Sequence, residues 1–314
     1  GGSSGHSAGV LPQRWGHTHA TNGERPHLLF GIPKKGRLHE KITGMLKGAG
    51  IEYTRPERVD IARCTNLPLS IVFLPAADIA KYVGEGEVDV GITGEDIVAE
   101  SDVEVDVLMK LGIGKCRLSV QAPVGTVSDP SDLVGKRIAT SFPQLTHAYF
   151  ASLEPRARAA GPTRVKVISG SVEAACGLGL ADGIVDLVET GTTMKAAGLE
   201  EVAVIMPTQT VLIANPHTRE HELIETIRKR IAGYVTANEY LMVTYNVQRV
   251  NLETVKRITP GKNSPSISPL ERADWIAVQA LVPKKHAAHV MDQLEAAGAQ
   301  DILLTALVSS RMGD

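Results

Sequence analysis

The segment from Gly183 to Lys195 constrains the fold more than any other part of the sequence. An apolar run of strand length at 184–188 leads into the Thr- and Gly-rich segment 189–193, and a helical pattern then continues to Gly198. A helix start leaves backbone amides unpaired at the positive end of the helix, so this loop is suited to an anion. The pattern predicts an α/β unit whose loop either binds a phosphate or only caps the helix with its threonines.

The pattern G-x-V-D-[VL]-x-x-T-G occurs at 86–94 and again at 183–191. This repetition predicts two similar α/β lobes, with ligands bound in a crevice at the carboxyl ends of the strands. Two acidic residues follow the first copy, and acidic side chains at a helix start weaken the case for a phosphate there. We therefore expect Thr93 and Gly94 to contact a sugar or a base.

A second strand-loop-helix unit opens the fold. A short apolar strand at 28–32 runs into Lys34, Lys35, Gly36 and Arg37, and a helical pattern follows. Cations at a helix N-terminus are disfavoured by the helix dipole, so an anion bound among them would explain the cluster. A solvated basic loop is the alternative.

A third loop of this kind is Ser169-Gly170-Ser171, which lies between a predicted strand and a predicted helix with Glu173 in its first turn. Small residues with hydroxyl groups at a helix start can bind a phosphate or cap the helix. The residues alone leave both interpretations open.

Composition excludes several classes of protein. The 314 residues carry a formal net charge of -2 and are 4 % aromatic, which argues against nucleic-acid binding. No apolar run reaches the roughly 18 residues that a membrane span needs. The three cysteines are widely spaced without metal-ligand spacing, and no export signal is recognisable. We expect a cytoplasmic protein that binds neither nucleic acid nor membrane.

The chain divides into four parts. Residues 1–26 lack hydrophobic periodicity and are interpreted as a disordered terminus or a remnant of cloning. The first lobe is expected over 27–100 with 195–217, and the second over 101–194. The last part, 218–314, begins with a long helical pattern and continues in the β-α-β-β-α-β order of a ferredoxin-like, ACT-like module. This module lacks paired carboxylates or a nucleophile set, which favours a regulatory role.

Several segments together resemble ATP phosphoribosyltransferase in its long form. The similarity covers nearly all of residues 28–308, and its strongest marks are the signature at 182–193 and the turn at 259–267. The amino-acid sequence of residues 73–79 most resembles that of fungal members. The resemblance implies an α/β fold of two periplasmic-binding-protein-like lobes around a catalytic cleft, followed by a histidine-binding regulatory domain.

The resemblance also implies an activity. The phosphoribosyl group of phosphoribosyl pyrophosphate would pass to N1 of ATP, giving phosphoribosyl-ATP and pyrophosphate in the first step of L-histidine biosynthesis. Mg²⁺ dependence, feedback inhibition by histidine and dimers that assemble into hexamers are implied as well. Displacement at an anomeric carbon needs alignment and charge stabilisation more than a protein nucleophile, which fits a chain with anion-binding loops.

The resemblance transfers roles to residues of this chain. The catalytic candidates are Asp186, Glu189 and Arg37, and either acid is a candidate Mg²⁺ ligand, with a structural carboxylate at the sheet end as the alternative for Asp186. The candidates for phosphoribosyl pyrophosphate are Asp182, Gly183, Asp186, Glu189, Thr190, Gly191, Thr192, Thr193, Ser169 and Glu173. The candidates for ATP are Lys34, Lys35, Gly36, Arg37, Asp89, Thr93 and Gly94, and those for allosteric histidine are Ser264, Pro265 and Ser266.

A non-enzymatic two-lobed binding protein or an amino-acid sensor is the alternative function. A sensor has no use for several phosphate-binding loops, and a periplasmic solute-binding protein would need an export signal. The appearance of an N1-substituted adenine on mixing with both substrates distinguishes an enzyme from a binder.

Overall fold

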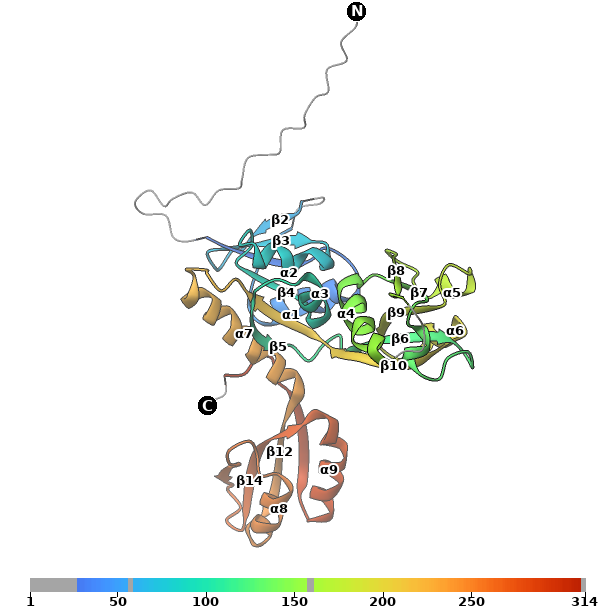
Figure 1. Cartoon of the computed structure of the whole chain (residues 1–314). Coiled ribbons are helices and arrows are strands. Elements are labelled where there is room, and N and C mark those ends of the chain that lie inside the picture. Colours follow the sequence, from blue (N-terminus) through green and yellow to red (C-terminus); the bar gives the residue numbers. More distant parts are fainter. Residues whose placement is uncertain (1–26, 56–58, 157–160, 312–314) are drawn as a thin grey trace, which may run out of the picture.

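The computed structural model describes residues 27–55, 59–156 and 161–311 (Figure 1). The predicted disordered or cloning-derived segment 1–26 lies outside the described residues. Three β-sheets organise the described chain, one in each of two α/β lobes and one in a C-terminal domain. In Figure 1 the two lobes lie side by side, and α7 leads from them to the C-terminal domain.

The first lobe is built on a six-stranded sheet with the order β2-β3-β1-β4-β11-β5. Strands β1, β3 and β4 are parallel, and β2 and β11 pair antiparallel with their neighbours. The elements of this lobe are β1 (Leu28–Pro33), α1 (Arg37–Gly48), β2 (Ile61–Arg63), β3 (Leu69–Leu74), η1 (Ala76–Asp78), α2 (Ile79–Gly84), β4 (Val90–Gly94), α3 (Glu95–Ser101), β5 (Asp106–Lys110), β11 (Thr210–Ala214) and α7 (His221–Glu239).

Helices cover both faces of this sheet. On one face α1 and α7 bury Leu46 and Ile227 against the strands. On the other face α2 buries Ile79 and Val83. Parallel strands between two helical layers are apolar on both faces, which explains the continuous hydrophobic runs of β1, β3 and β4. The polar residues that could bind a ligand are therefore confined to the ends of these strands.

The second lobe has a five-stranded sheet with the order β10-β6-β9-β7-β8. Phe150 of α4 packs on one face, and Ala175 of α5 and Met194 of α6 pack on the other. The elements of this lobe are β6 (Cys116–Pro123), η2 (Pro130–Leu133), β7 (Arg137–Thr140), α4 (Pro143–Leu153), η3 (Glu154–Arg156), β8 (Arg164–Val167), α5 (Ala174–Gly177), β9 (Gly183–Val188), α6 (Thr192–Ala196) and β10 (Leu199–Thr208).

The two lobes repeat one arrangement. The local orders are β3-β1-β4-β11 in the first lobe and β8-β7-β9-β6 in the second. In each, three parallel strands are followed by an antiparallel strand that leads to or from the other lobe. The repeated sequence pattern lies on β4 and β9, the equivalent third strands, and the prediction of two similar lobes is confirmed.

The chain crosses between the lobes at two points. One crossing runs through 111–115 between β5 and β6, and the other is Gln209 between β10 and β11. Because β5 pairs with β11 and β10 pairs with β6, the crossings differ from the expected boundaries at residues 100 and 194. The lobe that each strand joins depends on pairing between strands far apart in sequence. A local sequence pattern does not predict this pairing.

The C-terminal domain begins at β12 and not at residue 218. The helix α7 belongs to the first lobe, because Ile224, Ile227 and Ile231 are buried in that core. After it, the antiparallel sheet order β13-β14-β12-β15 confirms the predicted ferredoxin-like module. The elements of this domain are β12 (Tyr240–Gln248), η4 (Arg249–Asn251), α8 (Leu252–Ile258), β13 (Ser266–Pro269), β14 (Trp275–Pro283), η5 (Lys284–His286), α9 (Ala287–Ala296) and β15 (Gln300–Ala306).

Candidate functional site

Two of the predicted phosphate-binding loops share one edge of the second lobe. Strands β8 and β9 both pair in parallel with β7, so their carboxyl ends lie at the same edge of the sheet. The loop after β8 holds Ser169 and the loop after β9 begins at Glu189. The structure therefore brings these two predicted sets of residues together.

The loop after β9 turns at Gly191, which is buried and has a φ of 79°. This left-handed conformation costs a residue with a Cβ atom roughly 1–2 kcal/mol, so the turn favours glycine. The hydroxyls of Thr190 and Thr192 lie 3.0 Å apart, and the side chains of Thr192 and Thr193 are exposed. Because α6 has only five residues, these hydroxyls and the loop amides, more than a helix dipole, are the donors for an anion.

The loop after β8 is strained at Ser171, whose φ is 48° and follows the φ of 82° at Gly170. A serine in the left-handed region is uncommon, and such conformations concentrate at functional sites. Ser169 and Ser171 are exposed, and Glu173 is half-buried at the start of α5. This loop offers two hydroxyls at the same edge as the threonines.

Asp186 is a half-buried carboxylate on β9, close to the end that carries Glu189. Its Oδ1 accepts a hydrogen bond from the Leu187 amide at 2.8 Å. Burial raises the pKa of Asp186 and the nearby charge of Glu173 raises it further, while the Leu187 hydrogen bond acts in the opposite direction. Hydrogen bonds from hydroxyl groups stabilise the charged form of a half-buried carboxylate, and a ribose provides such hydroxyl groups.

Asp182 and Gly183 lie at the opposite end of β9. A strand of six residues spans about 20 Å, so the structure does not bring these two residues to the Thr/Gly loop. The Asp182 carboxylate instead accepts from the backbone amide of Arg137 at 3.0 Å and from its guanidinium at 2.8 Å. Arg137 holds the pKa of Asp182 down at about 2. This pair fastens β9 to β7.

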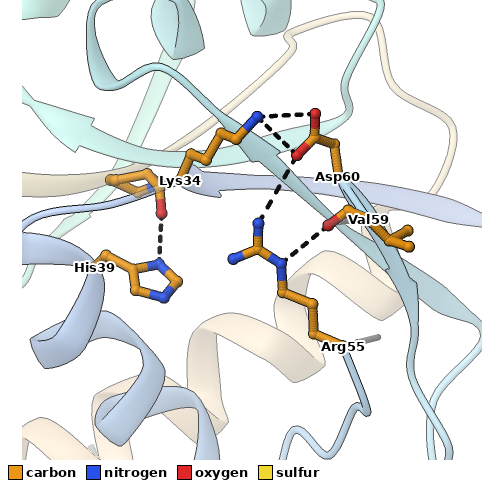
Figure 2. A network of polar contacts seen from close by, with 6 residues as sticks. Lys34, His39, Arg55, Val59 and Asp60 are labelled. Carbon is orange, nitrogen blue, oxygen red and sulfur yellow. Dashed lines mark hydrogen bonds and ion pairs between the residues drawn. The ribbon is translucent and has the colours of Figure 1, made fainter. Parts of the chain in front are cut away.

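The basic loop after β1 exposes Lys34, Lys35, Gly36 and Arg37. Lys34 forms an ion pair with Asp60, with Nζ 2.9 Å from Oδ1 and 3.0 Å from Oδ2 (Figure 2). Among the described residues, Lys35 and Arg37 form no ion pair. Lys34 is therefore partly neutralised within the fold, and the other two cations are the ones available to an anion.

Arg55 joins the same network, as Figure 2 shows. Its guanidinium lies 3.7 Å from the centre of the Phe73 ring and 3.8 Å from the Asp60 carboxylate, and its Nε donates to the Val59 carbonyl at 2.9 Å. Arg55 and Asp60 were not predicted as functional residues, because both lie in a polar segment without a recognisable pattern.

The candidates at β4 make contacts within the fold. Asp89 precedes the strand, and its Oδ2 accepts from the Leu29 amide at 2.8 Å. Thr93 is fully buried. Gly94 has no room for a side chain, since a Cβ there would collide with the buried Asp96 carboxylate. Thr93 and Gly94 are the last two residues of β4, and the length of the strand separates Asp89 from that end.

The basic loop and the Thr/Gly loop follow strands that end beside the crossings between the lobes. Leu38, in the first turn of α1, lies 4.0 Å from the position that a Cβ of Gly114 would occupy. Two residues further along, burial raises the pKa of the Cys116 thiol to about 11, and the charges of Asp96 and Glu189 raise it as well. Val188 at the end of β9 pairs with Arg117, so Glu189 follows a strand end that lies beside the crossing through 111–115. The carboxyl ends of β1 and β4 lie beside the start of β11, at the other crossing.

Side chains that sequence analysis missed tie the lobes together. The buried Asp96 accepts from the Thr208 hydroxyl at 2.6 Å, and its amide donates to the same hydroxyl at 3.0 Å. Glu100 on α3 accepts from the amides of Gln144 and Leu145 at 2.9 and 3.0 Å, at the start of α4 in the other lobe. Only the folded arrangement reveals these contacts, because the partners lie far apart in sequence.

Ser264 and Ser266 line a hollow of about 240 Å³ on the C-terminal domain, together with the cation Lys262. Pro265 is not among the residues that line it. Two of the three predicted histidine-binding residues therefore share one depression.

Over the described ranges, no group of three or more His, Cys, Asp or Glu side chains is arranged to hold a metal ion. None of the helices in those ranges is both long and apolar enough to span a membrane.

Two family models match the chain, and between them they cover most of it. The family described as ATP phosphoribosyltransferase matches residues 75–233, and the family described as HisG, C-terminal domain matches residues 237–309. The junction between the two matches lies near the start of β12, where the third sheet begins.

Relatives with the same name extend over nearly the whole chain. The ATP phosphoribosyltransferases of Yarrowia lipolytica and Saccharomyces cerevisiae are 46 % and 45 % identical to it over 93 % and 91 % of its length, covering 99 % and 97 % of their own. A solved chain titled ATP phosphoribosyl transferase (HisG:HisZ) complex from Thermotoga maritima aligns with a TM-score of 0.57 and 29 % identity over 65 % of this chain and 98 % of its own. Similarity of this extent shows that the chain belongs to the ATP phosphoribosyltransferase family.

Proposed function

We propose that the chain transfers the phosphoribosyl group of phosphoribosyl pyrophosphate to N1 of ATP, the first step of L-histidine biosynthesis. One observation carries the proposal: in a member of this family, the strand that leads into the Thr/Gly loop of one lobe and the strand that leads into the basic loop of the other both end beside the connections between the lobes. Both substrates belong to the nucleotide metabolism of the cell interior, so a cytoplasmic location is part of the proposal.

The reaction assigns a task to each loop. N1 of the adenine attacks C1 of the ribose, the C1–O bond to pyrophosphate breaks, and pyrophosphate leaves with the electron pair. The Glu189 to Thr193 loop holds the 5′-phosphate with hydroxyls and amides, and Ser169 and Ser171 add donors at the same edge. Asp186 accepts hydrogen bonds from the ribose hydroxyls and so orients C1 for attack.

The basic loop acts on the other substrate and on the leaving group. Arg37 and Lys35 are exposed and form no ion pair within the described residues, so they are available to the phosphates of ATP or to pyrophosphate. Their fixed charges favour the transition state, in which negative charge grows on the departing pyrophosphate.

Mg²⁺ is part of the proposal as a neutraliser of that charge. The donor set fits an ion held mainly by substrate oxygens, because Glu189 is an exposed single carboxylate and Asp186 is half-buried. Glu189, beside the threonine loop, would supply a carboxylate oxygen to that ion. When bound, the ion supplies electrostatic stabilisation of the leaving oxygens.

Regulation by histidine and assembly into dimers and hexamers belong to the same proposal. The hollow beside Ser264 and Ser266 offers hydroxyls and the Lys262 ammonium, which suit the carboxylate of an amino acid. On the sheet face away from the helices, Leu303 of β15 is 62 % exposed, so this face is open to contact with another copy.

The test is to mix the protein with ATP, phosphoribosyl pyrophosphate and Mg²⁺ and to follow the ultraviolet change of an N1-substituted adenine. We expect product in proportion to enzyme and none with Gly191→Val. Binding of both substrates without product would support the alternative of a two-lobed binding protein.

A further inference from the structure

Two polar side chains on β6, Ser119 and Gln121, are buried without full hydrogen bonding. Ser119 is 0 % exposed and Gln121 is 1 % exposed. Within the described chain, neither Ser119 Oγ nor Gln121 Oε1 has a hydrogen-bond partner. Buried polar atoms in native proteins are nearly always paired, and leaving one unpaired is costly. Two such atoms on one short stretch of strand require an explanation.

The strand alternation shows where these side chains point. Leu118 and Val120 pack in the core on the α4 side of the sheet. Since alternate residues of a strand face opposite sides, Ser119 and Gln121 point to the face covered by α5 and α6. Asp186 points to this face as well, because it is the residue directly opposite Ser119 in the antiparallel pair β6–β9.

Both side chains are within reach of Asp186. Gln121 Nε2 donates to the Asp186 backbone carbonyl at 3.3 Å. Residues directly opposed in an antiparallel pair have Cβ atoms about 4.5–5.5 Å apart, so a serine hydroxyl and an aspartate carboxylate can meet after side-chain rotation. In the described state the Asp186 carboxylate is turned to the adjacent Leu187 amide.

We propose that Ser119 and Gln121 are positioning residues for Asp186 in the complex with phosphoribosyl pyrophosphate. The inference rests on the proposed function, in which Asp186 accepts the ribose hydroxyls. When those hydroxyls bind, the carboxylate leaves the Leu187 amide and accepts from Ser119 Oγ, while Gln121 holds the strand through the Asp186 carbonyl. The serine hydroxyl that is unpaired in the free protein is paired in the complex.

The test compares Ser119→Ala, Asp186→Asn and the double variant in the full-length protein. We expect Ser119→Ala to raise the KM for phosphoribosyl pyrophosphate about 10- to 100-fold, the range for a hydrogen bond to a charged group, and to leave the KM for ATP unchanged. The double variant should be no worse than Asp186→Asn, because Ser119 acts only through that carboxylate. The affinity for phosphoribosyl pyrophosphate, measured by calorimetry without ATP, should rank the parent and the variants in the same order as their KM values.

Two further variants separate hydrogen bonding from packing. Ser119→Cys keeps the side-chain volume with a weaker donor and should resemble Ser119→Ala. Thr43→Val removes another unpartnered buried hydroxyl, on α1 of the first lobe, and should change neither KM. An unchanged KM in Ser119→Ala, or effects that multiply in the double variant, overturns the inference while the proposed activity stands. A parent protein that forms no product overturns the proposed function itself.

Discussion

Asp89 and Asp182 occupy equivalent positions in the two lobes and make the same pair of backbone contacts. The Asp89 amide donates to the Leu29 carbonyl and its carboxylate accepts from the Leu29 amide. Asp182 exchanges the same two hydrogen bonds with Arg137. Each aspartate precedes the third parallel strand of its lobe and fastens it to the first. Their equivalence assigns both residues to the fold and not to the ligand site.

The first prediction concerns the pH dependence of this contact. The pKa of Asp182 lies below its ordinary value, at about 2 in the folded chain. The group therefore stabilises the fold above its unfolded pKa of about 3.9, and this stabilisation is lost as the pH falls toward 2. We expect Asp182→Asn to lower the unfolding temperature at pH 7, with the difference from the parent shrinking between about pH 4 and pH 2. A difference that persists in acid would exclude the Arg137 contact as its source.

The second prediction concerns the turn at Gly191. Gly191→Val should strain a backbone with a φ of 79° and close the approach of a phosphate, so activity should fall below detection in the product assay. Gly125→Val is the matched control, because Gly125 has a φ of 75° in the turn after β6, at the end away from the crossing. The two variants should lose similar stability, measured by thermal unfolding, and only the control should remain active. An active Gly191→Val protein would remove this loop from the site.

The third prediction concerns the basic loop, which contains Arg37 and the Lys34 that pairs with Asp60. Arg37→Ala should raise the KM for ATP by about tenfold or more, as expected for a lost hydrogen bond to a charged group. Asp60→Asn should lower the KM for ATP at low salt, because it releases Lys34 from its internal partner. Lys34→Ala combined with Asp60→Asn should cancel that gain. If Asp60→Asn alone weakens ATP binding, the carboxylate supports the loop and does not compete for its cation.

The predictable part of this protein is local in sequence. The run at 184–188 predicted a strand, and the segment after it predicted a loop that leads into a helix; all three are present. The lobe boundaries were predicted wrongly because β10 pairs with β6 across a long stretch of chain. The repeated pattern identified equivalent strands, yet it aligned Asp89 with Asp186, whereas the backbone contacts align Asp89 with Asp182.

Side-chain pairs between distant segments were the other part that local patterns could not supply. Asp60 lies in a segment with no periodicity, and its role depends on Lys34 being brought beside it by the β1–β3 sheet. Glu100 and the start of α4 meet only because the two lobes fold against each other. Such contacts depend on tertiary packing, which no spacing in the sequence records.

The fourth prediction concerns Glu100. Its carboxylate caps the first amides of α4 from the other lobe, and loss of a cap costs about 0.5–2 kcal/mol. Glu100→Ala should lower the unfolding temperature and increase amide exchange at Gln144 and Leu145. Glu100→Gln retains one acceptor and should lie between the parent and Glu100→Ala. Unchanged exchange at both amides in Glu100→Ala would show that the cap does not hold the lobes together.

The last prediction is that free L-histidine inhibits the enzyme through the C-terminal domain. The hollow lined by Ser264, Ser266 and Lys262 lies on a module without a predicted catalytic residue, so loss of inhibition can be separated from loss of activity. We expect Lys262→Ala and Ser266→Ala to raise the histidine concentration needed for half inhibition about 10- to 100-fold while kcat is unchanged. Coupling requires histidine to bind two arrangements of the protein unequally, by about 1–3 kcal/mol, and linkage then requires the substrates to change histidine affinity by the same factor. Calorimetry of histidine binding with and without ATP measures that factor. Inhibition that is unchanged in both variants and competitive with ATP would place histidine between the catalytic lobes and contradict the prediction.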